Sequence, residues 1–137
     1  QLCAGRVLRQ RLMRLLLDTH VLLWTLADDP RLRRNARAAI ESASEIHFSV
    51  ASCWEIAIKA GIGRLDADVA EIRRVANHCG FIELPVLGEH VEALQALRPL
   101  HRDPFDRLLV AQAISEPMRL LTADASLAGY SELVMKV

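Results

Sequence analysis

Cysteine is scarce in this chain. Its 137 residues include three, Cys3, Cys53 and Cys79, which are widely separated and odd in number. That count fits neither a disulfide framework nor a paired CxxC metal clip, so a reducing, cytoplasmic compartment is the simplest expectation. No apolar run approaches the length that spans a bilayer, which predicts a soluble protein with no membrane partner.

An excess of basic residues is also missing. The 17 Lys and Arg residues balance 17 Asp and Glu residues, so the formal net charge is zero and offers no broad electrostatic attraction for nucleic acid. Arginines do gather locally, at Arg31, Arg33, Arg34 and Arg37, although such clusters are usually solvated helix faces. A nucleic-acid substrate would have to be held at a local site, with or without a contribution from a second subunit.

The length and the hydrophobic fraction of 52% indicate one folded domain with a proper core. Residues 1–12 show no clear periodicity or helix cap and lack the apolar segment of a signal peptide. Every recognisable element begins after Met13. We therefore expect the domain to comprise residues 13–137, with residues 1–12 an upstream or expression-derived segment outside the fold.

Strands and helices alternate along the rest of the chain. The run Arg14-Leu15-Leu16-Leu17 is short and apolar, as in a strand that is buried on both faces. Further strands are predicted at 46–50, 81–84, 119–122 and 133–135. Helices are predicted at 19–26, 33–43, 52–61, 69–78, 89–97 and 104–114, with a helical turn near 126–128. This alternation predicts an α/β fold, a three-layer α/β/α sandwich around a parallel sheet of about five strands.

Two helix starts carry clear local signals. Ser52 and Glu55 have the spacing of a capping box, and Gly61 would end that helix. Asp103 precedes Pro104, which predicts an N-cap followed by proline at the first helical position.

Four carboxylates stand out, and each has a purely structural alternative. Asp18 and Asp124 could be N-caps, Glu55 could complete the capping box, and Asp106 could serve its own helix terminus. Together they favour a site, because residues that follow parallel strands gather at one edge of the sheet. Four anions crowded together require a cation. With no convergent Cys or His pair, the oxygen ligands favour Mg²⁺ or Mn²⁺ over Zn²⁺.

Four segments in order, LLLDTHVLLW, SVASCWEIAIK, HRDPFDRLLVAQA and LLTADASL, make the chain resemble a PIN domain, and more narrowly a VapC-type toxin of a prokaryotic toxin–antitoxin pair. The resemblance implies a metal-dependent endoribonuclease acting on single-stranded or looped RNA. It also implies a homodimer and a cognate VapB-type antitoxin that buries the active site. The implied Mg²⁺ or Mn²⁺ ligands and catalytic residues are Asp18, Glu55, Asp106 and Asp124. Asp103 is an extra acid beside Asp106, which leaves open which of the two binds metal.

Other residues near the predicted site have two readings each. Thr19 and Thr122 match family positions that often carry a hydroxyl near the site, but either could instead cap a helix. Arg102 and Arg107 could contact RNA phosphate or form surface salt bridges. Because a metal-bound water suffices as nucleophile, a packing or loop role is favoured for His20 and His101.

Two other functions compete with this hypothesis. A phosphatase of the haloacid dehalogenase type needs a second Asp two residues after the first, and this chain has His20 there. A non-catalytic PIN-like module that binds RNA or protein is the main alternative. Such modules usually lose acids, whereas this sequence retains all four.

Overall fold

The computed structural model of the protein describes residues 13–137; the expectation for residues 1–12 lies outside the described part. One sheet holds β1 (Arg14–Leu17), β2 (Glu45–Ser49), β3 (Ile82–Leu84), β4 (Arg119–Thr122) and β5 (Val134–Lys136). Its strand order is β3-β2-β1-β4-β5, and every neighbouring pair is parallel. The predicted five-stranded parallel sheet is confirmed.

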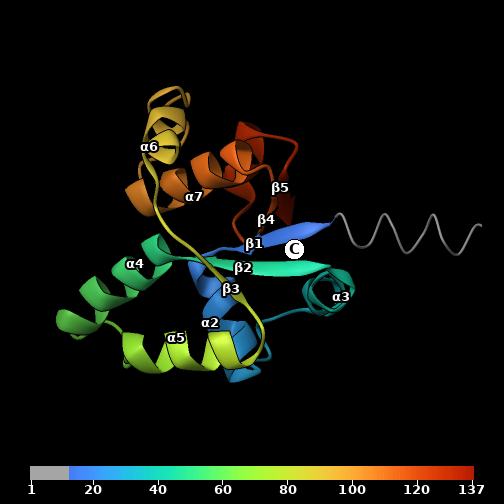
Figure 1. The fold of residues 1–137 in the computed structure, drawn as a ribbon, viewed down its shortest axis with the longest axis vertical. Helices are drawn as coiled ribbons and strands as arrows, with labels where there is room; N and C mark the ends of the chain where they lie inside the picture. Colours follow the sequence, from blue (N-terminus) through green and yellow to red (C-terminus); the bar gives the residue numbers. More distant parts are fainter. Residues whose placement is uncertain (1–12) are drawn as a thin grey trace, which may run out of the picture.

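Helices cover both faces of this sheet (Figure 1). On one side lie α2 (Thr19–Ala27), α3 (Arg34–Ser42) and α5 (Val69–His78), and on the other lie α6 (Gly88–Gln95) and α7 (Pro104–Ser115). The helix α4 (Val50–Gly61) continues directly from β2, and the 3₁₀ helix η1 (Ala125–Tyr130) follows β4. The three-layer α/β/α sandwich is confirmed. Within residues 13–137, no helix combines the length and apolarity needed to cross a membrane.

The central strand β1 supplies side chains to two separate cores. Leu15 and Leu17 pack with Val21 of α2 and with the α3 and α5 side, whereas Leu16 packs with Leu109 of α7. Side chains alternate between the two faces of a pleated strand, and helices cover both faces of this sheet. All three leucines are therefore fully buried. This explains why the run is apolar throughout rather than alternating.

The carboxyl ends of β1 and β4 lie side by side. Leu17 pairs with Leu121 in the register, and the Asp18 N–H donates to the Leu121 carbonyl at 3.0 Å. Residues that follow these two strands are therefore brought to one edge of the sheet, although about a hundred positions separate them in the chain.

The predicted capping box at Ser52 and Glu55 is wrong. Helix α4 begins at Val50, and its N-cap is Ser49, whose hydroxyl accepts from the Ala51 N–H at 3.0 Å. Because β2 ends at Ser49 and the helix starts at once, Ser52 lies inside the first turn. Both Ser52 and Glu55 are thereby free to face another element. The predicted end of this helix at Gly61 is confirmed, and Ile62 follows it as the C-cap.

A buried polar contact holds α7 against the start of α4. The Ser49 hydroxyl donates to Gln112 Oε1 at 2.6 Å, and the Gln112 amide donates to the Pro85 carbonyl at 3.3 Å. Both side chains are fully buried, so leaving either unpaired would cost about 1–3 kcal/mol. The contact fixes the two helices that carry Glu55 and Asp106.

Candidate functional site

Asp18 follows β1 and is held by contacts from two elements. Its carboxylate accepts from the Val21 N–H at 2.9 Å, which makes it the N-cap of α2. The Thr122 hydroxyl at the end of β4 donates to its other oxygen. Burial raises the pKa of Asp18, and these hydrogen bonds oppose that rise only in part. The residue is thus both a cap and a poorly hydrated carboxylate.

Glu55 lies in α4 with its side chain buried against α2. The Thr19 hydroxyl donates to Glu55 Oε1 at 2.7 Å and lies 2.9 Å from Ser52 Oγ. The Lys59 ammonium, one turn further along α4, contacts Glu55 Oε2 at 2.6 Å. Glu55 is only 3% exposed, so this cation offsets much of the cost of burying its charge.

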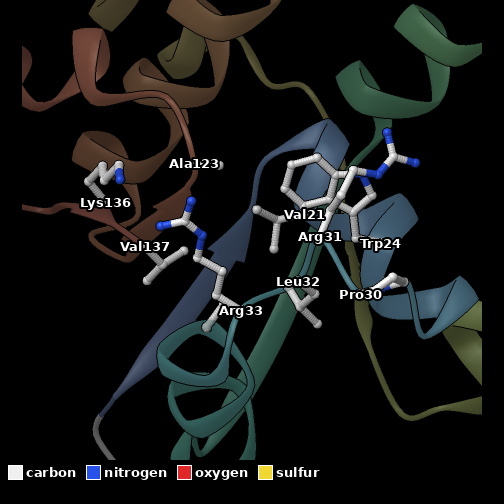
Figure 2. A pocket seen from close by; sticks show the side chains of 10 residues that line it. Val21, Trp24, Pro30, Arg31, Leu32, Arg33, Ala123, Lys136 and Val137 are labelled. Carbon is white, nitrogen blue, oxygen red and sulfur yellow. The ribbon is translucent and has the colours of Figure 1, made fainter.

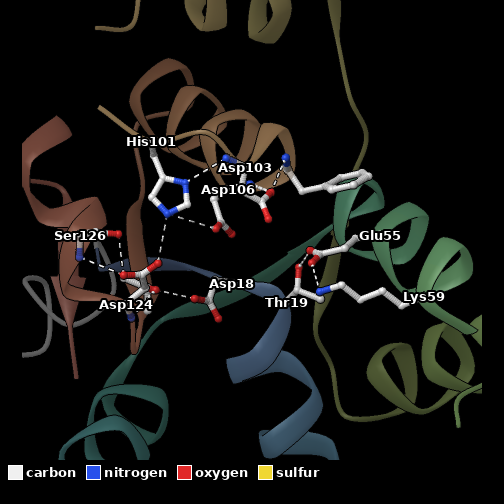
Figure 3. A network of polar contacts seen from close by, with 11 residues as sticks. Asp18, Thr19, Glu55, Lys59, His101, Asp103, Asp106, Asp124 and Ser126 are labelled. Atoms are coloured by element: carbon white, nitrogen blue, oxygen red, sulfur yellow. Dashed lines mark hydrogen bonds and ion pairs between the residues drawn. The ribbon is translucent and has the colours of Figure 1, made fainter. Parts of the chain in front are cut away.

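Asp103 and Asp106 have different environments at the start of α7. Asp103 is the N-cap and accepts from the N–H groups of Phe105 at 2.8 Å and Asp106 at 3.1 Å. The Asp106 carboxylate makes no hydrogen bond within residues 13–137 and points toward the sheet edge (Figure 3). Burial, followed by the charges of Asp103, Asp18 and Glu55, raises the pKa of Asp106 to about 7.

Asp124 completes the group from the end of β4. It caps η1, accepting from the Ser126 N–H at 2.9 Å and from the Ser126 hydroxyl at 2.6 Å. The hydroxyl bond lowers the pKa of Asp124. His101 Nε2 lies 3.4 Å from Asp124 Oδ2 and 3.9 Å from Asp106 Oδ2. One ligand atom from each of these three residues lies within 4.8 Å of the others.

This arrangement is chemically suited to a divalent cation. Figure 3 shows Asp18, Asp106 and Asp124 around a common space, with Glu55 farther along the same edge. Burial, and then repulsion from the neighbouring acids, raises the pKa of Asp106, so its ionised form is not fully compensated. Carboxylate oxygens are ligands of Mg²⁺ and Mn²⁺, and a bound cation would relieve this repulsion.

The sequence pattern of the PIN domain family matches residues 15–133. This match takes in β2, β3 and β4, most of β1 and each of the carboxylates described above. The chain belongs to the PIN domain family. Ribonuclease VapC22 of Mycobacterium tuberculosis is 33% identical to this PIN domain over 119 residues, which cover 84% of this chain and 90% of that protein.

Solved structures show the same fold at lower identity. VapBC2 from Rickettsia felis, bound to a DNA fragment from its promoter, gives a TM-score of 0.66 at 15% identity, covering 90% of this chain and 98% of that one. A toxin–antitoxin complex from Klebsiella pneumoniae gives 0.62 at 19% identity, covering 88% and 95%. FitAcB from Neisseria gonorrhoeae gives 0.56 at 17% identity, covering 82% and 89%.

In this PIN domain, the structure brings most of the predicted site residues to one edge. The four acids and the two supporting hydroxyls of Thr19 and Thr122 belong to this group, and each hydroxyl contacts one of the acids. The two predicted RNA contacts, Arg102 and Arg107, stay a prediction, and in residues 13–137 their side chains form no hydrogen bond with these acids or hydroxyls. Arg107 Nη2 lies 3.5 Å from the Leu97 carbonyl, beyond the end of α6. Arg102 is exposed, and within the described range neither arginine forms an ion pair with an acid.

His101 was expected near the site in a packing or loop role. It does serve its loop, since its Nδ1 accepts from the Asp103 N–H at 3.1 Å, and its other nitrogen lies between two site acids. One residue of the site, Lys59, was missed by reasoning from the sequence, and it could have been found from its i,i+4 spacing to Glu55.

Proposed function

We propose that this protein is the toxin of a toxin–antitoxin pair and acts as a Mg²⁺- or Mn²⁺-dependent endoribonuclease. Its relative from Mycobacterium tuberculosis is named a ribonuclease at 33% identity. The observation that carries the proposal is the convergence of Asp18, Glu55, Asp106 and Asp124 at one edge of the sheet, with the pKa of Asp106 raised to about 7 by burial and by its acidic neighbours.

The residues fit a divalent cation. Asp18, Asp106 and Asp124 would supply carboxylate oxygens, with Glu55 completing the acidic edge. When bound, the cation would lower the pKa of a water and stabilise the charge that develops on the phosphodiester. That water can act as the nucleophile, so no side chain of the protein is required for this role. This accounts for a site of acids rather than one built around an activated Ser or Cys.

The remaining contacts keep the acids in place. Thr122 orients Asp18, and its oxygen also accepts from the Asp124 N–H at 3.0 Å, so a single hydroxyl joins two of the acids. Thr19 and Lys59 hold the two oxygens of Glu55. Such supporting contacts fix ligand geometry, and their loss typically lowers metal affinity or activity by about 10–100-fold.

The partners proposed are an RNA substrate, a cognate VapB-type antitoxin and a second copy of the chain, in the cytoplasm. Three structural relatives are titled as VapBC2, as a toxin–antitoxin complex and as FitAcB. Large apolar side chains are exposed along α4, including Trp54 at 58% and Ile58 at 43%. Exposed apolar surface of this kind is typical of protein interfaces.

Purified protein tests the function directly. We expect cleavage of a fluorescent single-stranded RNA in Mg²⁺ or Mn²⁺ and none in EDTA, together with calorimetric binding of Mn²⁺. Asp18→Asn should lose cleavage, whereas the exposed Asp66→Asn should cleave like wild type. Wild-type protein that binds RNA or a protein partner but cleaves no RNA in either metal would instead favour the non-catalytic module.

A further inference from the structure

A cavity of about 260 Å³ lies against the β4–β5 side of the sheet, where the β1–α2 junction, the loop before α3 and the end of β5 meet (Figure 2). Its apolar floor is formed by Val21, Leu32 and Ala36, all buried. Its basic lining includes Arg33 and Lys136. Cavities with an apolar floor and a few convergent charges are typical of ligand sites.

Two basic side chains reach this cavity from elements that are far apart in the sequence. Arg33 is the N-cap of α3 and Lys136 ends β5. Figure 2 shows the Arg33 guanidinium turned toward Ala123 and Lys136. Neither side chain forms an ion pair or side-chain hydrogen bond with any residue from 13 to 137. Their positive charges therefore face the cavity uncompensated by this part of the chain.

The neighbouring arginines are engaged elsewhere. Arg31 pairs with Asp29 at 2.8 Å and stacks over Trp24, 5.4 Å from the ring centroid. Arg37 contacts Asp28 and the Leu32 carbonyl. The local arginine cluster thus contains two paired members, Arg31 and Arg37, and an exposed Arg34 outside the cavity. Arg33 is the member that is directed into the cavity without a pairing acid in residues 13–137.

The cavity shares a wall with the acidic site. Ala123 lines it and lies between Thr122 and Asp124 in the chain. Val21 lines it too, and its N–H binds the Asp18 carboxylate. The cationic cavity therefore lies directly beside the proposed metal ligands. In this position it could hold one phosphate of a polyanion while the phosphodiester to be cut lies at the acids.

The start of α3 adds to the positive potential. The Arg33 side chain does not cap this nine-residue helix. Of the first N–H groups, that of Ala36 donates to Asn35 Oδ1 at 2.9 Å, and both Arg33 and Ala36 line the cavity. The amino end of a helix attracts anions through these groups and the helix dipole. The amino end of α3 adds to the positive potential of Arg33 and Lys136, which remain the main anion-binding groups of the proposed site.

We propose that this cavity is a subsite for an RNA phosphate that flanks the cleaved bond, with Arg33 and Lys136 as its ligands and the sugar packing on the apolar floor. The proposal rests on the ribonuclease function proposed above. It explains how a chain of zero net charge holds RNA, because a strand needs only a few well-placed phosphate contacts at the site.

Binding to a short fluorescent single-stranded RNA, measured by anisotropy in EDTA, tests the subsite without chemistry. The variants are Arg33→Ala, Lys136→Ala and the double variant. The matched control is Arg34→Ala. It removes the same charge at the next position along the chain, from a side chain that is exposed and lies outside the cavity. Circular dichroism melts confirm that all four fold.

We expect the double variant to bind about tenfold more weakly than wild type, and Arg34→Ala to bind within about twofold of it. The slope of log affinity against log salt should fall by about 0.7 in the double variant, the value for one lost phosphate contact on a single strand. If the loss of RNA affinity per removed charge were the same in the double variant and in Arg34→Ala, the subsite would be overturned. Such a result would reflect non-specific electrostatic attraction between the protein and RNA.

A neutral methylphosphonate placed at one linkage at a time identifies the phosphate. In wild type, one replacement near the cleaved bond should weaken binding, and the double variant should be insensitive to that replacement. Additive losses at every linkage would contradict the proposal. Wild-type cleavage of the unmodified RNA in Mn²⁺ is run in parallel. Its absence refutes the ribonuclease, whereas cleavage with the same KM in the double variant and in Arg34→Ala refutes the subsite alone.

Discussion

The substitution Asp106→Asn should separate the stability of this protein from its chemistry. Asn keeps the shape of the side chain and removes its charge. In the folded chain, burial and the charges of Asp103, Asp18 and Glu55 raise the pKa of Asp106 to about 7, against an ordinary value of 3.8. The ionised form is therefore disfavoured by folding as long as no cation is bound.

The sign of the effect follows from proton binding. Between about pH 4 and pH 7 the folded protein holds a proton on Asp106 that the unfolded chain has lost, so the free energy of unfolding falls as pH rises. A shift of about three units corresponds to about 4 kcal/mol. Solvent reaches the carboxylate, whose side chain is 22% exposed, so we expect about half of this, ~2 kcal/mol.

Urea unfolding in EDTA, followed by tryptophan fluorescence, measures this difference. The stability advantage of Asp106→Asn over wild type should grow by about 1.5 kcal/mol between pH 4 and pH 8, because an effect of ~2 kcal/mol corresponds to a shift of about 1.5 units and most of that titration lies in this range. At pH 8 the variant should melt about 5 °C above the wild type. The exposed Asp66→Asn serves as the control and should show no such growth.

Adding metal should reverse the order. Mg²⁺ or Mn²⁺ at about 100 times its dissociation constant should stabilise the wild type by about 2.7 kcal/mol and the variant by much less. RNA cleavage by Asp106→Asn should fall to the EDTA background. A variant that loses stability with pH as steeply as the wild type, or that cleaves RNA at the wild-type rate, would refute this account of Asp106.

Three further predictions concern Asp18, Asp103 and the start of the chain. Asp18→Asn should keep the α2 cap, melt within a few degrees of wild type and lose RNA cleavage; wild-type cleavage would reduce Asp18 to a cap. Asp103→Ala removes two backbone contacts and should cost about 0.5–2 kcal/mol in thermal melts while retaining Mg²⁺-dependent cleavage; an inactive variant would make Asp103 a metal ligand. A chain beginning at Met13 should fold and cleave RNA, and a product without helical circular dichroism would contradict this.

Local patterns in the sequence were sufficient for the fold class and for most elements. The apolar run from Arg14 to Leu17 and the alternation that follows it predict a parallel sheet, and β4 occupies Arg119–Thr122 as predicted. Asp103 and Pro104 mark the start of α7 as predicted. These signals act within one turn or one strand, which is why they can be read without knowing the partner elements.

The capping-box error shows where such local signals compete. Ser49 and Ser52 are both good N-caps, and the spacing to Glu55 favours Ser52. Strand pairing decides between them, because β2 pairs with β3 through Ser49 and Leu84 and the chain turns into α4 immediately afterwards. A contact with another strand therefore sets the helix start, and Glu55 faces Thr19 instead of its own N-cap.

Hydrophobic periodicity and helix caps are properties of neighbouring residues, so most elements of this PIN domain and the acids that follow its strands could be predicted from the amino-acid sequence. The strand order, the approach of His101 to Asp124, and the meeting of Arg33 with Lys136 at one cavity could be seen only in the folded chain. These two pairs of residues lie 23 and 103 positions apart in the chain. These arrangements depend on how buried faces pack against the sheet, which no local pattern specifies.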